Sequence, residues 1–491
     1  MKNQLSLFLI VMNKLKIPFV LVGLLLFITE CGDNKSSKPG ELVPSTTTDY
    51  PAKDFRYVIC TDMTHDDDNS LIRLLHYANE IDIEAITVTD QGPETNKIEN
   101  WPEKMWNRAM AIFEAYGQVV DNLRLHDPNF PSVEYFRSIT KQGKGTAQRM
   151  TGSSDNGQEK FWDYVGEDWD SEASELLIKV FEKDDDRPIY IGFWGGSITF
   201  AQAMWRYQQN HSPSEVQALL DKMIFHCISF QDVTFDMFVD LDSIGKNIGT
   251  KKSFYGDYDG KRHYPRMLLA DGNNFWKYIG AVNEDSIYKY SGPLGDLYDK
   301  GGEGDTPAFL NLIAMNRGLS HIENPEFGGW GDMFKKYGLK NVWVADHNKP
   351  EELMKWLPET TNSFYARCMW EENDYESCNH DPIAAFDSDS SPAFVYLSAK
   401  PGDKVSLSAQ GSYDPDNDEL KYSWFYYPEA SSGKAEVNIN NHTEKEASFI
   451  MPQISVGLQI HLLLEVRDNG SPQLVAYKRV IIEALKSDEE V

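Results

Sequence analysis

Apolar and polar positions follow two different rhythms along the chain, and the change comes near residue 381. Between residues 55 and 345, short apolar runs typical of buried strands alternate with amphipathic stretches of helical spacing. After residue 381, short strand-like segments are separated by Gly and Asn/Asp turns. The first rhythm predicts a doubly wound, mostly parallel α/β sheet, and the second predicts an all-β, Ig-like sandwich.

The individual elements can be placed from the same pattern. In the first region we expect buried strands at 57–60, 83–88, 189–193 and 222–229. Helices are expected at 71–78, 106–116, 171–183 and 199–206, and the polar segment 118–168 is expected to be a lid over the site. Sandwich strands are expected at 394–397, 404–408, 420–426, 447–450, 459–466 and 476–483.

The length of 491 residues is too great for a single core, so we expect several domains. The predicted boundaries are a signal peptide at 1–31, a flexible tether at 32–54, an α/β domain at 55–345, a connector at 346–380 and the sandwich at 381–487. The connector is expected to hold a short helix at 350–356 and to be polar elsewhere.

The N-terminal region has the pattern of a targeting segment. Two lysines precede an apolar stretch at 17–28, and Cys31 follows, with Met1 or Met12 as the start. The sequence Ile-Thr-Glu-Cys resembles a bacterial lipobox, although Glu30 stands where a small residue is expected. We expect an exported cell-envelope lipoprotein, held at the outer or cytoplasmic membrane through lipid on Cys31; an uncleaved anchor and an ordinary cleaved signal are the alternatives.

The net charge and the cysteine content restrict which partners and metals we expect the chain to bind. A net charge of −29 argues against nucleic acid, whose phosphates the chain would repel. Cys60 and Cys227 lie in apolar runs and are expected to be buried thiols, while an oxidising compartment would permit a bond between Cys368 and Cys378. No CxxC pair or HExxH motif occurs, which argues against zinc. The sequence leaves open whether the chain forms a homo-oligomer.

The strongest chemical signal is a group of aspartates directly after the first predicted strand, at Asp62, Asp66, Asp67 and Asp68. Ligands bind at the carboxyl ends of strands in open α/β sheets, and crowded carboxylates suit a hard cation, Ca²⁺ or Mg²⁺. Aspartates at a helix start are also ordinary caps and dipole partners, with Asn69 or Ser70 as candidate caps. Asp62 differs from the others because it stands at the strand end.

Residues 62–67, DMTHDD, resemble the DPGxDD turn after the first strand of nucleoside hydrolases. More closely, the chain resembles the nucleoside hydrolase-like domain of exported bacterial cellulose-binding proteins, in the segments 61–86, 122–144, 194–205 and 292–331. Residues 411–420 with Trp424 resemble the turn of PKD-like and cadherin-like modules, and the same cellulose-binding family carries such a domain at its C-terminus.

The resemblance implies a Ca²⁺-dependent hydrolase of glycosyl bonds, with N-glycosyl bonds in first place and Mg²⁺ as a second choice of ion. The implied metal ligands are Asp62, Asp67, Asp305 and a backbone carbonyl near Ile198, with Asp62 also taking a proton from the attacking water. The resemblance implies sugar contacts at Asp66, Gln91 and Thr199, and Trp330 is a further candidate because it stands on a glycine-rich turn and aromatic faces suit sugar rings. Simpler assignments remain open, namely a plain turn at 194–197, a helix cap at Asp305 and a core position for Trp330.

Gly304 stands where nucleoside hydrolases carry a His associated with the leaving base, so classical nucleoside cleavage is in question. Two alternatives to an enzyme therefore stay open. One is a non-catalytic cellulose- or polysaccharide-binding protein that uses the hydrolase-like cleft or the sandwich, and the other is an adhesion or scaffold protein. In the sandwich, Asp414, Asp416 and Asp418 either hold a structural Ca²⁺ or cap their own turn.

Overall fold

The structure is a computed structural model, in which residues 46–491 group into one compact unit. It describes residues 50–89, 101–145, 165–228, 266–270, 292–298, 302–336, 342–345 and 350–486. The predicted signal peptide, nearly all of the predicted tether and Gln91 lie outside the described residues. Within the described part of the chain, no helix is both long enough and apolar enough to cross a membrane.

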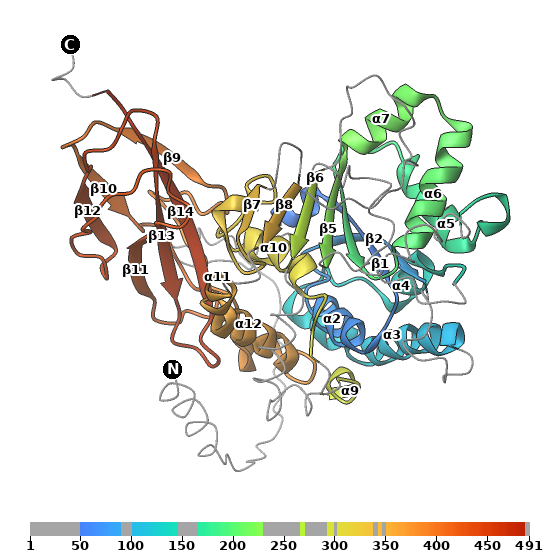
Figure 1. The fold of residues 1–491 in the computed structure, drawn as a ribbon. Coiled ribbons are helices and arrows are strands. Elements are labelled where there is room, and N and C mark those ends of the chain that lie inside the picture. The colour runs from blue at the N-terminus through green and yellow to red at the C-terminus, as the bar shows by residue number, and fades with distance from the viewer. Residues whose placement is uncertain are drawn as a thin grey trace, which may run out of the picture. The chain divides into compact units, whose positions relative to one another are not determined.

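The first part of the chain forms one eight-stranded sheet with the order β3-β2-β1-β4-β5-β6-β8-β7 (Figure 1). Neighbouring strands are parallel except for the antiparallel edge pair β7 and β8. This is the doubly wound, mostly parallel sheet that the sequence predicts. The strands are β1 (Arg56–Thr61), β2 (Asp82–Val88), β3 (Thr140–Gln142), β4 (Ile189–Trp194), β5 (Met223–Ile228), β6 (Arg266–Ala270), β7 (Phe334–Lys336) and β8 (Val342–Ala345).

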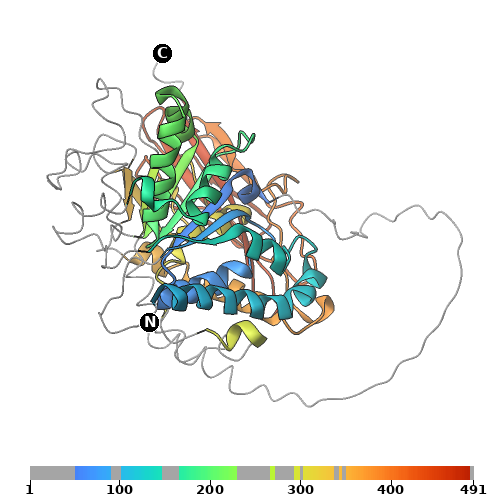
Figure 2. The same ribbon diagram turned by 90° about the vertical axis from the view of Figure 1, so that its right-hand side faces the viewer.

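Helices cover both faces of this sheet, and the alternation of side chains along β1 shows the two layers. Tyr57 and Ile59 belong to the core that includes α2, α3 and α10, whereas Val58 and Cys60 belong to the core under α5, α6 and α7. Figure 2 shows α6 and α7 of one layer in green, and α2 and α3 of the other layer in blue and cyan. The bounds are α2 (His65–Leu75), α3 (Trp101–His126), α4 (Val133–Ile139), α5 (Glu172–Phe181), α6 (Ser197–Asn210), α7 (Pro213–Asp221), α9 (Gly292–Gly295) and α10 (Pro307–Asn316).

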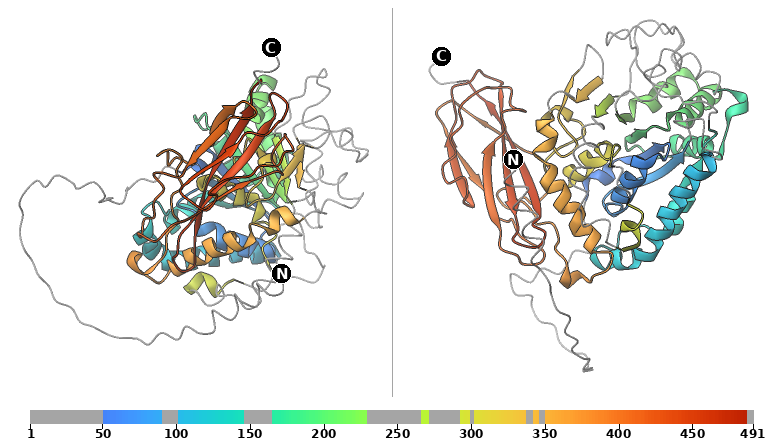
Figure 3. Two further views of the ribbon diagram at one scale, coloured as in Figure 1. Left: turned by 90° about the vertical axis from the view of Figure 1, so that its left-hand side faces the viewer. Right: turned by 60° about the horizontal axis from the view of Figure 1, so that its bottom comes forward.

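The C-terminal part is a sandwich of a four-stranded sheet, β11-β13-β14-β9, and a two-stranded sheet, β10-β12 (Figure 3). Its core contains Trp424, Leu407, Phe449 and Leu462. The strands are β9 (Val395–Ala399), β10 (Lys404–Ser408), β11 (Lys421–Tyr426), β12 (Glu446–Ile450), β13 (Gln459–Arg467) and β14 (Val475–Ala484). The predicted Ig-like sandwich is therefore present. Before it, the chain forms α11 (Glu351–Met354) and α12 (Leu357–Met369).

The expected lid at 118–168 is wrong for its described part. Helix α3 continues to His126 because Val119, Val120 and Leu123 extend its buried stripe, and α4 and β3 follow. Residues 146–164 of the expected lid lie outside the described residues.

Candidate functional site

The site lies at the switch point of the sheet, between β1 and β4. The chain leaves β1 into α2 on one face and leaves β4 into α6 on the other, and open α/β sheets bind ligands where adjacent strands diverge in this way. The two turns meet, since Thr61 and Gly195 form an isolated β-bridge. Gly195 has a φ of +118°, and a Cβ there would lie 2.5 Å from Asp62 Oδ2. A glycine is required for the β4–α6 turn to pass this close to Asp62.

Hydroxyl groups on the β1–α2 turn hold the aspartates in place. Thr61 Oγ1 donates to Asp67 Oδ1 in a very short hydrogen bond, and Thr64 Oγ1 donates to Asp67 Oδ2 at 3.0 Å. Thr64 also donates its backbone N–H to Asp62 Oδ1 at 3.2 Å and its hydroxyl to Asp66 Oδ1 at 3.3 Å. Neither threonine was expected at the site; Thr61 could have been noticed at the end of the first strand, whereas Thr64 becomes the N-cap only because α2 begins earlier than expected.

Asp305 reaches the same place from a distant part of the chain, just before α10. One carboxylate oxygen each of Asp66, Asp67 and Asp305 lies within 4.8 Å of the other two. Two hydrogen bonds attach the incoming segment to α2, from Asn69 Nδ2 to the Gly302 carbonyl at 2.8 Å and from Thr306 Oγ1 to Ser70 Oγ at 3.1 Å. The structure therefore brings together three of the four aspartates expected at the site, and Asp62 borders them.

The electrostatics of this group favour an added positive charge. Burial, followed by the charges of Asp62 and Asp66, raises the pKa of Asp67, and the hydrogen bonds from Thr61 and Thr64 offset this only in part. Neither Asp66 nor Asp67 forms an ion pair with a Lys or Arg among the described residues. A proton or a bound cation relieves such repulsion, and an all-carboxylate donor set fits a hard divalent cation such as Ca²⁺ or Mg²⁺.

A positive side chain stands at the border of the turn. Arg108, on α3, forms an ion pair with Asp68 at 3.3 Å and donates to the Met63 carbonyl at 3.3 Å. Met63 itself has a φ of +55°. The ion pair with Arg108 gives Asp68 a structural role at this turn, which was not expected from the sequence.

Ile198 and Thr199 lie in the first turn of α6, where the helix begins at Ser197. A metal-ligating carbonyl near Ile198 stays a prediction. Thr199 is buried, and its hydroxyl pairs with the Thr89 hydroxyl at 2.5 Å, which ties α6 to the end of β2. These contacts fit a structural role at the turn.

Trp330 does not offer a face to a sugar. It is only 1% exposed, and the guanidinium of Arg317 lies 5.2 Å from the centre of a ring of its indole. Arg317 caps the C-terminal end of α10, a helix about 15 Å long whose other end follows Asp305. The expectation of an exposed tryptophan is therefore corrected to a core residue. His226 is likewise buried, beside Tyr190, and burial lowers its pKa to about 3.

The aspartate-rich turn of the sandwich caps itself. Asp414 Oδ1 accepts the backbone N–H groups of Asp416 and Asp418 at 2.8 and 3.0 Å. Asp416 pairs with His380 at 2.9 Å. The turn therefore caps itself through Oδ1, while Asp414 Oδ2 is buried without a hydrogen-bond partner among the described residues, so a structural Ca²⁺ here stays a prediction. Cys368 and Cys378 are both free thiols in the structure.

An open doubly wound sheet with this aspartate turn after its first strand defines a nucleoside hydrolase-like α/β protein. The chain belongs to the cellulose-binding Sde182 family. Residues 56–334 match the model of its nucleoside hydrolase-like domain, and residues 404–484 match the model of the C-terminal domain of cellulose-binding protein Sde0182. Both parts of the predicted resemblance are thereby confirmed.

A similar solved structure is a nucleoside hydrolase-related hypothetical protein from Saccharophagus degradans that is associated with carbohydrate metabolism. It is 31% identical over 88% of this chain and 100% of its own, with a TM-score of 0.70. The PKD domain from KIAA 1837 protein matches 19% of this chain and 83% of its own at 20% identity and a TM-score of 0.15. Human CDH23 EC21-23 matches 21% of this chain and 34% of its own at 15% identity and a TM-score of 0.17. No curated protein matches the chain.

Proposed function

We propose that the chain is a divalent-cation-dependent hydrolase of glycosyl bonds, with N-glycosyl bonds as the first class of substrate to test. The observation that supports this most directly is the convergence of Asp66, Asp67 and Asp305 at the sheet's switch point, within 4.8 Å of one another. The burial of Asp67 and Asp305 and the mutual repulsion of the three carboxylates are characteristic of sites that hold a hard cation.

Asp66, Asp67 and Asp305 would hold the ion, with Asp62 beside them; the sequence resemblance named Asp62 in place of Asp66 as a ligand. Ca²⁺ is the proposed ion and Mg²⁺ the alternative. When bound, such an ion lowers the pKa of a coordinated water and orients vicinal hydroxyls.

The side chains of this chain supply the remaining chemistry. Asp62 accepts a backbone hydrogen bond from Thr64 through Oδ1, and Gly195 keeps the space beside Oδ2 free of a Cβ, so this carboxylate is placed to take a proton from an attacking water. Asp66 is proposed to accept a hydrogen bond from a sugar hydroxyl. Because glycosidic cleavage develops positive charge on the sugar, the surrounding carboxylates stabilise its transition state.

The test uses the full-length chain with Ca²⁺ and Mg²⁺ titrated by calorimetry, followed by assays of base or sugar release from nucleosides and oligosaccharides. We expect Asp67→Asn to weaken cation binding and to reduce turnover by at least about 100-fold. Asp121→Asn, at an exposed carboxylate on α3, is the matched control and should change neither quantity. Cation binding without turnover of any of these substrates by the wild-type chain would overturn the proposed hydrolase.

A second candidate is polysaccharide binding, which the family description supports. Tyr396, on the edge strand β9, is 64% exposed, more than the other exposed aromatic side chains among the described residues. An exposed aromatic ring can stack on a sugar face. Export and lipid attachment at Cys31 likewise remain proposals, testable by membrane fractionation of a Cys31→Ala variant.

A further inference from the structure

We propose a second metal site in this chain, a zinc site formed by His76, Cys368 and Glu371. One ligand atom from each residue lies within 4.8 Å of the other two, and all three side chains are buried. His76 is the C-cap of α2, while Cys368 lies in the last turn of α12 and Glu371 follows that helix. The three come from chain segments nearly 300 residues apart, so no motif in the sequence could reveal them.

The imidazole of His76 is oriented as in metal-binding histidines. Its Nδ1 lies 2.8 Å from the Ile72 carbonyl, an acceptor only, so Nδ1 carries the proton and donates it. Its Nε2 is therefore the nitrogen that faces Glu371 Oε1, at 2.7 Å. A backbone carbonyl that fixes the tautomer in this way is the usual outer partner of a metal-bound histidine.

The second carboxylate oxygen of Glu371 is an independent indication of a ligand. Glu371 Oε2 is buried and has no hydrogen-bond partner among the described residues. A Cβ at Gly292 would lie only 2.4 Å from it, so glycine is needed for the chain to pass there. A buried carboxylate oxygen left unsatisfied is costly, and a cation between Glu371, His76 and Cys368 would satisfy it.

The donor set selects zinc over the ion proposed for the aspartates. Imidazole nitrogen, thiolate sulfur and one carboxylate form a Zn²⁺ donor set, whereas Ca²⁺ and Mg²⁺ require oxygen. The charges also balance. The ion and the neighbouring Arg73 supply three positive charges, and Glu303, Glu371 and the Cys368 thiolate supply three negative ones, with Glu303 only 2.6 Å from Arg73.

Binding would displace the thiol proton of Cys368 and the proton shared by His76 Nε2 and Glu371 Oε1, both of which pass to solvent. Burial, and then the charge of Glu371, raises the pKa of Cys368, so the thiol is protonated until the metal replaces its proton. The bound ion would join α2, which carries the aspartate cluster at its start, to α12.

The test uses the full-length chain, stripped of metal with a chelator and then titrated with Zn²⁺ or Co²⁺. We expect a stoichiometric zinc ion that Ca²⁺ does not displace, and a thiolate-to-cobalt charge-transfer band in the near-ultraviolet. Cys368→Ser should abolish the band, and Glu371→Gln should weaken zinc binding about tenfold or more. The matched control Cys378→Ser, at the buried cysteine that follows α12, should keep the band.

The wild-type chain alone can overturn the proposal: if it is folded and binds Co²⁺ without a thiolate band, the site does not exist, whatever the variants do. If folded Cys368→Ser keeps the thiolate band, Cys368 is not a ligand and the proposed zinc site is likewise ruled out. Asp67→Asn should leave the band unchanged, which separates this site from the proposed hydrolase site.

Discussion

Gly304 determines how closely the segment before α10 can approach the aspartate turn. A Cβ at this position would lie 2.2 Å from Asp66 Oδ2, a distance that side chains do not tolerate. The His that nucleoside hydrolases carry at this point therefore could not fit here with Asp66 in its present position. The absence of a His at position 304 and the close approach of Gly304 to Asp66 are therefore linked, because the close approach requires a residue without a side chain.

Gly304→Ala should displace Asp66 and weaken Ca²⁺ binding roughly tenfold, equivalent to about 1.4 kcal/mol of binding free energy. Calorimetric titration measures the change. Gly117→Ala is the matched control, because its new Cβ would meet only Val133, at an ordinary 3.4 Å, and its affinity should equal that of the wild type. Equal Ca²⁺ affinities in the wild type, Gly304→Ala and Gly117→Ala would show that Asp66 is not part of the cation site.

His126 should make stability depend on pH. Burial lowers its pKa to about 4, although the hydrogen bond to the Asn373 carbonyl acts in the opposite direction, and its ring stacks on Trp370 at 4.7 Å. Its folded pKa lies below the unfolded value of about 6.5, so the unfolded chain binds more protons between these values. Its contribution to stability is therefore complete above about pH 6.5 and is lost as the pH falls toward 4.

Urea unfolding at pH 7 and pH 4.5 checks this, with an expected loss at the lower pH of up to about 3 kcal/mol from this residue. The variant His126→Gln lacks the titrating ring and should lose less stability between the two pH values than the wild type. The same loss in both proteins would assign the pH dependence to other groups.

At the residue scale, the sequence could indicate chemistry but not burial. Asp62, Asp66 and Asp67 are visible as a cluster because they are close in the chain, and Asp305 was found only through the family resemblance. Trp330 was misplaced, because a tryptophan among glycines gives the same pattern whether its ring is exposed or packed against Arg317.

At the scale of elements, α2 begins earlier than the sequence indicated. Its N-cap is Thr64, so Asp66, Asp67 and Asp68 lie in the first turn, where negative charge is favourable at the positive end of the helix dipole. Asn69 and Ser70, the expected caps, instead hold the segment before α10. Asp66 and Asp67 thus both favour the helix start and form part of the cluster.

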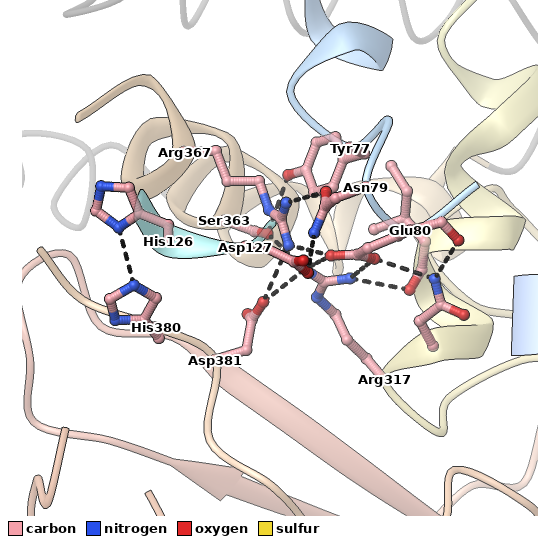
Figure 4. Close-up of polar contacts among 12 residues, drawn as sticks. Tyr77, Asn79, Glu80, His126, Asp127, Arg317, Ser363, Arg367, His380 and Asp381 are labelled. Atoms are coloured by element: carbon pink, nitrogen blue, oxygen red, sulfur yellow. Dashed lines mark hydrogen bonds and ion pairs between the residues drawn. The ribbon is translucent and has the colours of Figure 1, made fainter. Parts of the chain in front are cut away.

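The turn between α2 and β2 and the C-terminal end of α10 are joined to α12 by a buried ionic network (Figure 4). Glu80 pairs with Arg317 at 3.0 Å and with Arg367 in a very short contact, and Arg317 pairs with Asp381 at 2.6 Å. Burial alone would raise the pKa of Glu80, but the charges of Arg317 and Arg367 outweigh it, so the pKa is lowered. The carboxylate is therefore ionised and shared between two arginines.

Glu80→Gln should lower the free energy of unfolding by about 3–5 kcal/mol, because it leaves buried guanidinium charge without full compensation. Urea unfolding measures this. Glu114→Gln, which breaks an exposed pair with Arg137, is the matched control and should cost no more than about 1 kcal/mol. A loss at Glu80 as small as the loss at Glu114 would show that the network contributes little net stability.

The network also explains why α12 was expected to be a polar connector. Ser363 and Arg367 are buried because partners from the end of α2, the turn after it and the end of α10 satisfy them, and the buried Thr360 hydroxyl donates to the Leu357 carbonyl of its own helix. A sequence shows polarity but not the partners that allow polar groups into a core, so a buried polar helix has the same pattern as a solvated linker.

At the scale of the whole molecule, the fold class was predictable because two different periods run through the chain. Parallel strands covered on both faces appear as apolar runs, as β1, β4 and β5 do, and sandwich strands alternate. The position of β3 at one edge and the antiparallel pair β7 and β8 at the other could not be predicted, because these strands are short and their pairing depends on contacts with distant segments.

The two proposed functions use different parts of the chain and are therefore separable by a crossed experiment. Asp67→Asn should abolish release of base or sugar from a soluble substrate and leave retention on insoluble cellulose unchanged, since Asp67 is buried at the sheet switch point. Tyr396→Ala should reduce retention several-fold and leave turnover unchanged, since it removes only an exposed ring.

Ile450→Ala removes a comparably exposed apolar side chain, 54% exposed, from the other sheet of the sandwich, and it should change neither quantity. Retention that falls with Asp67→Asn but not with Tyr396→Ala would place polysaccharide in the hydrolase-like domain itself. Together with absent turnover in the wild type, that result would replace the proposed hydrolase with a binding protein, because the acidic site would then contribute recognition and no chemistry.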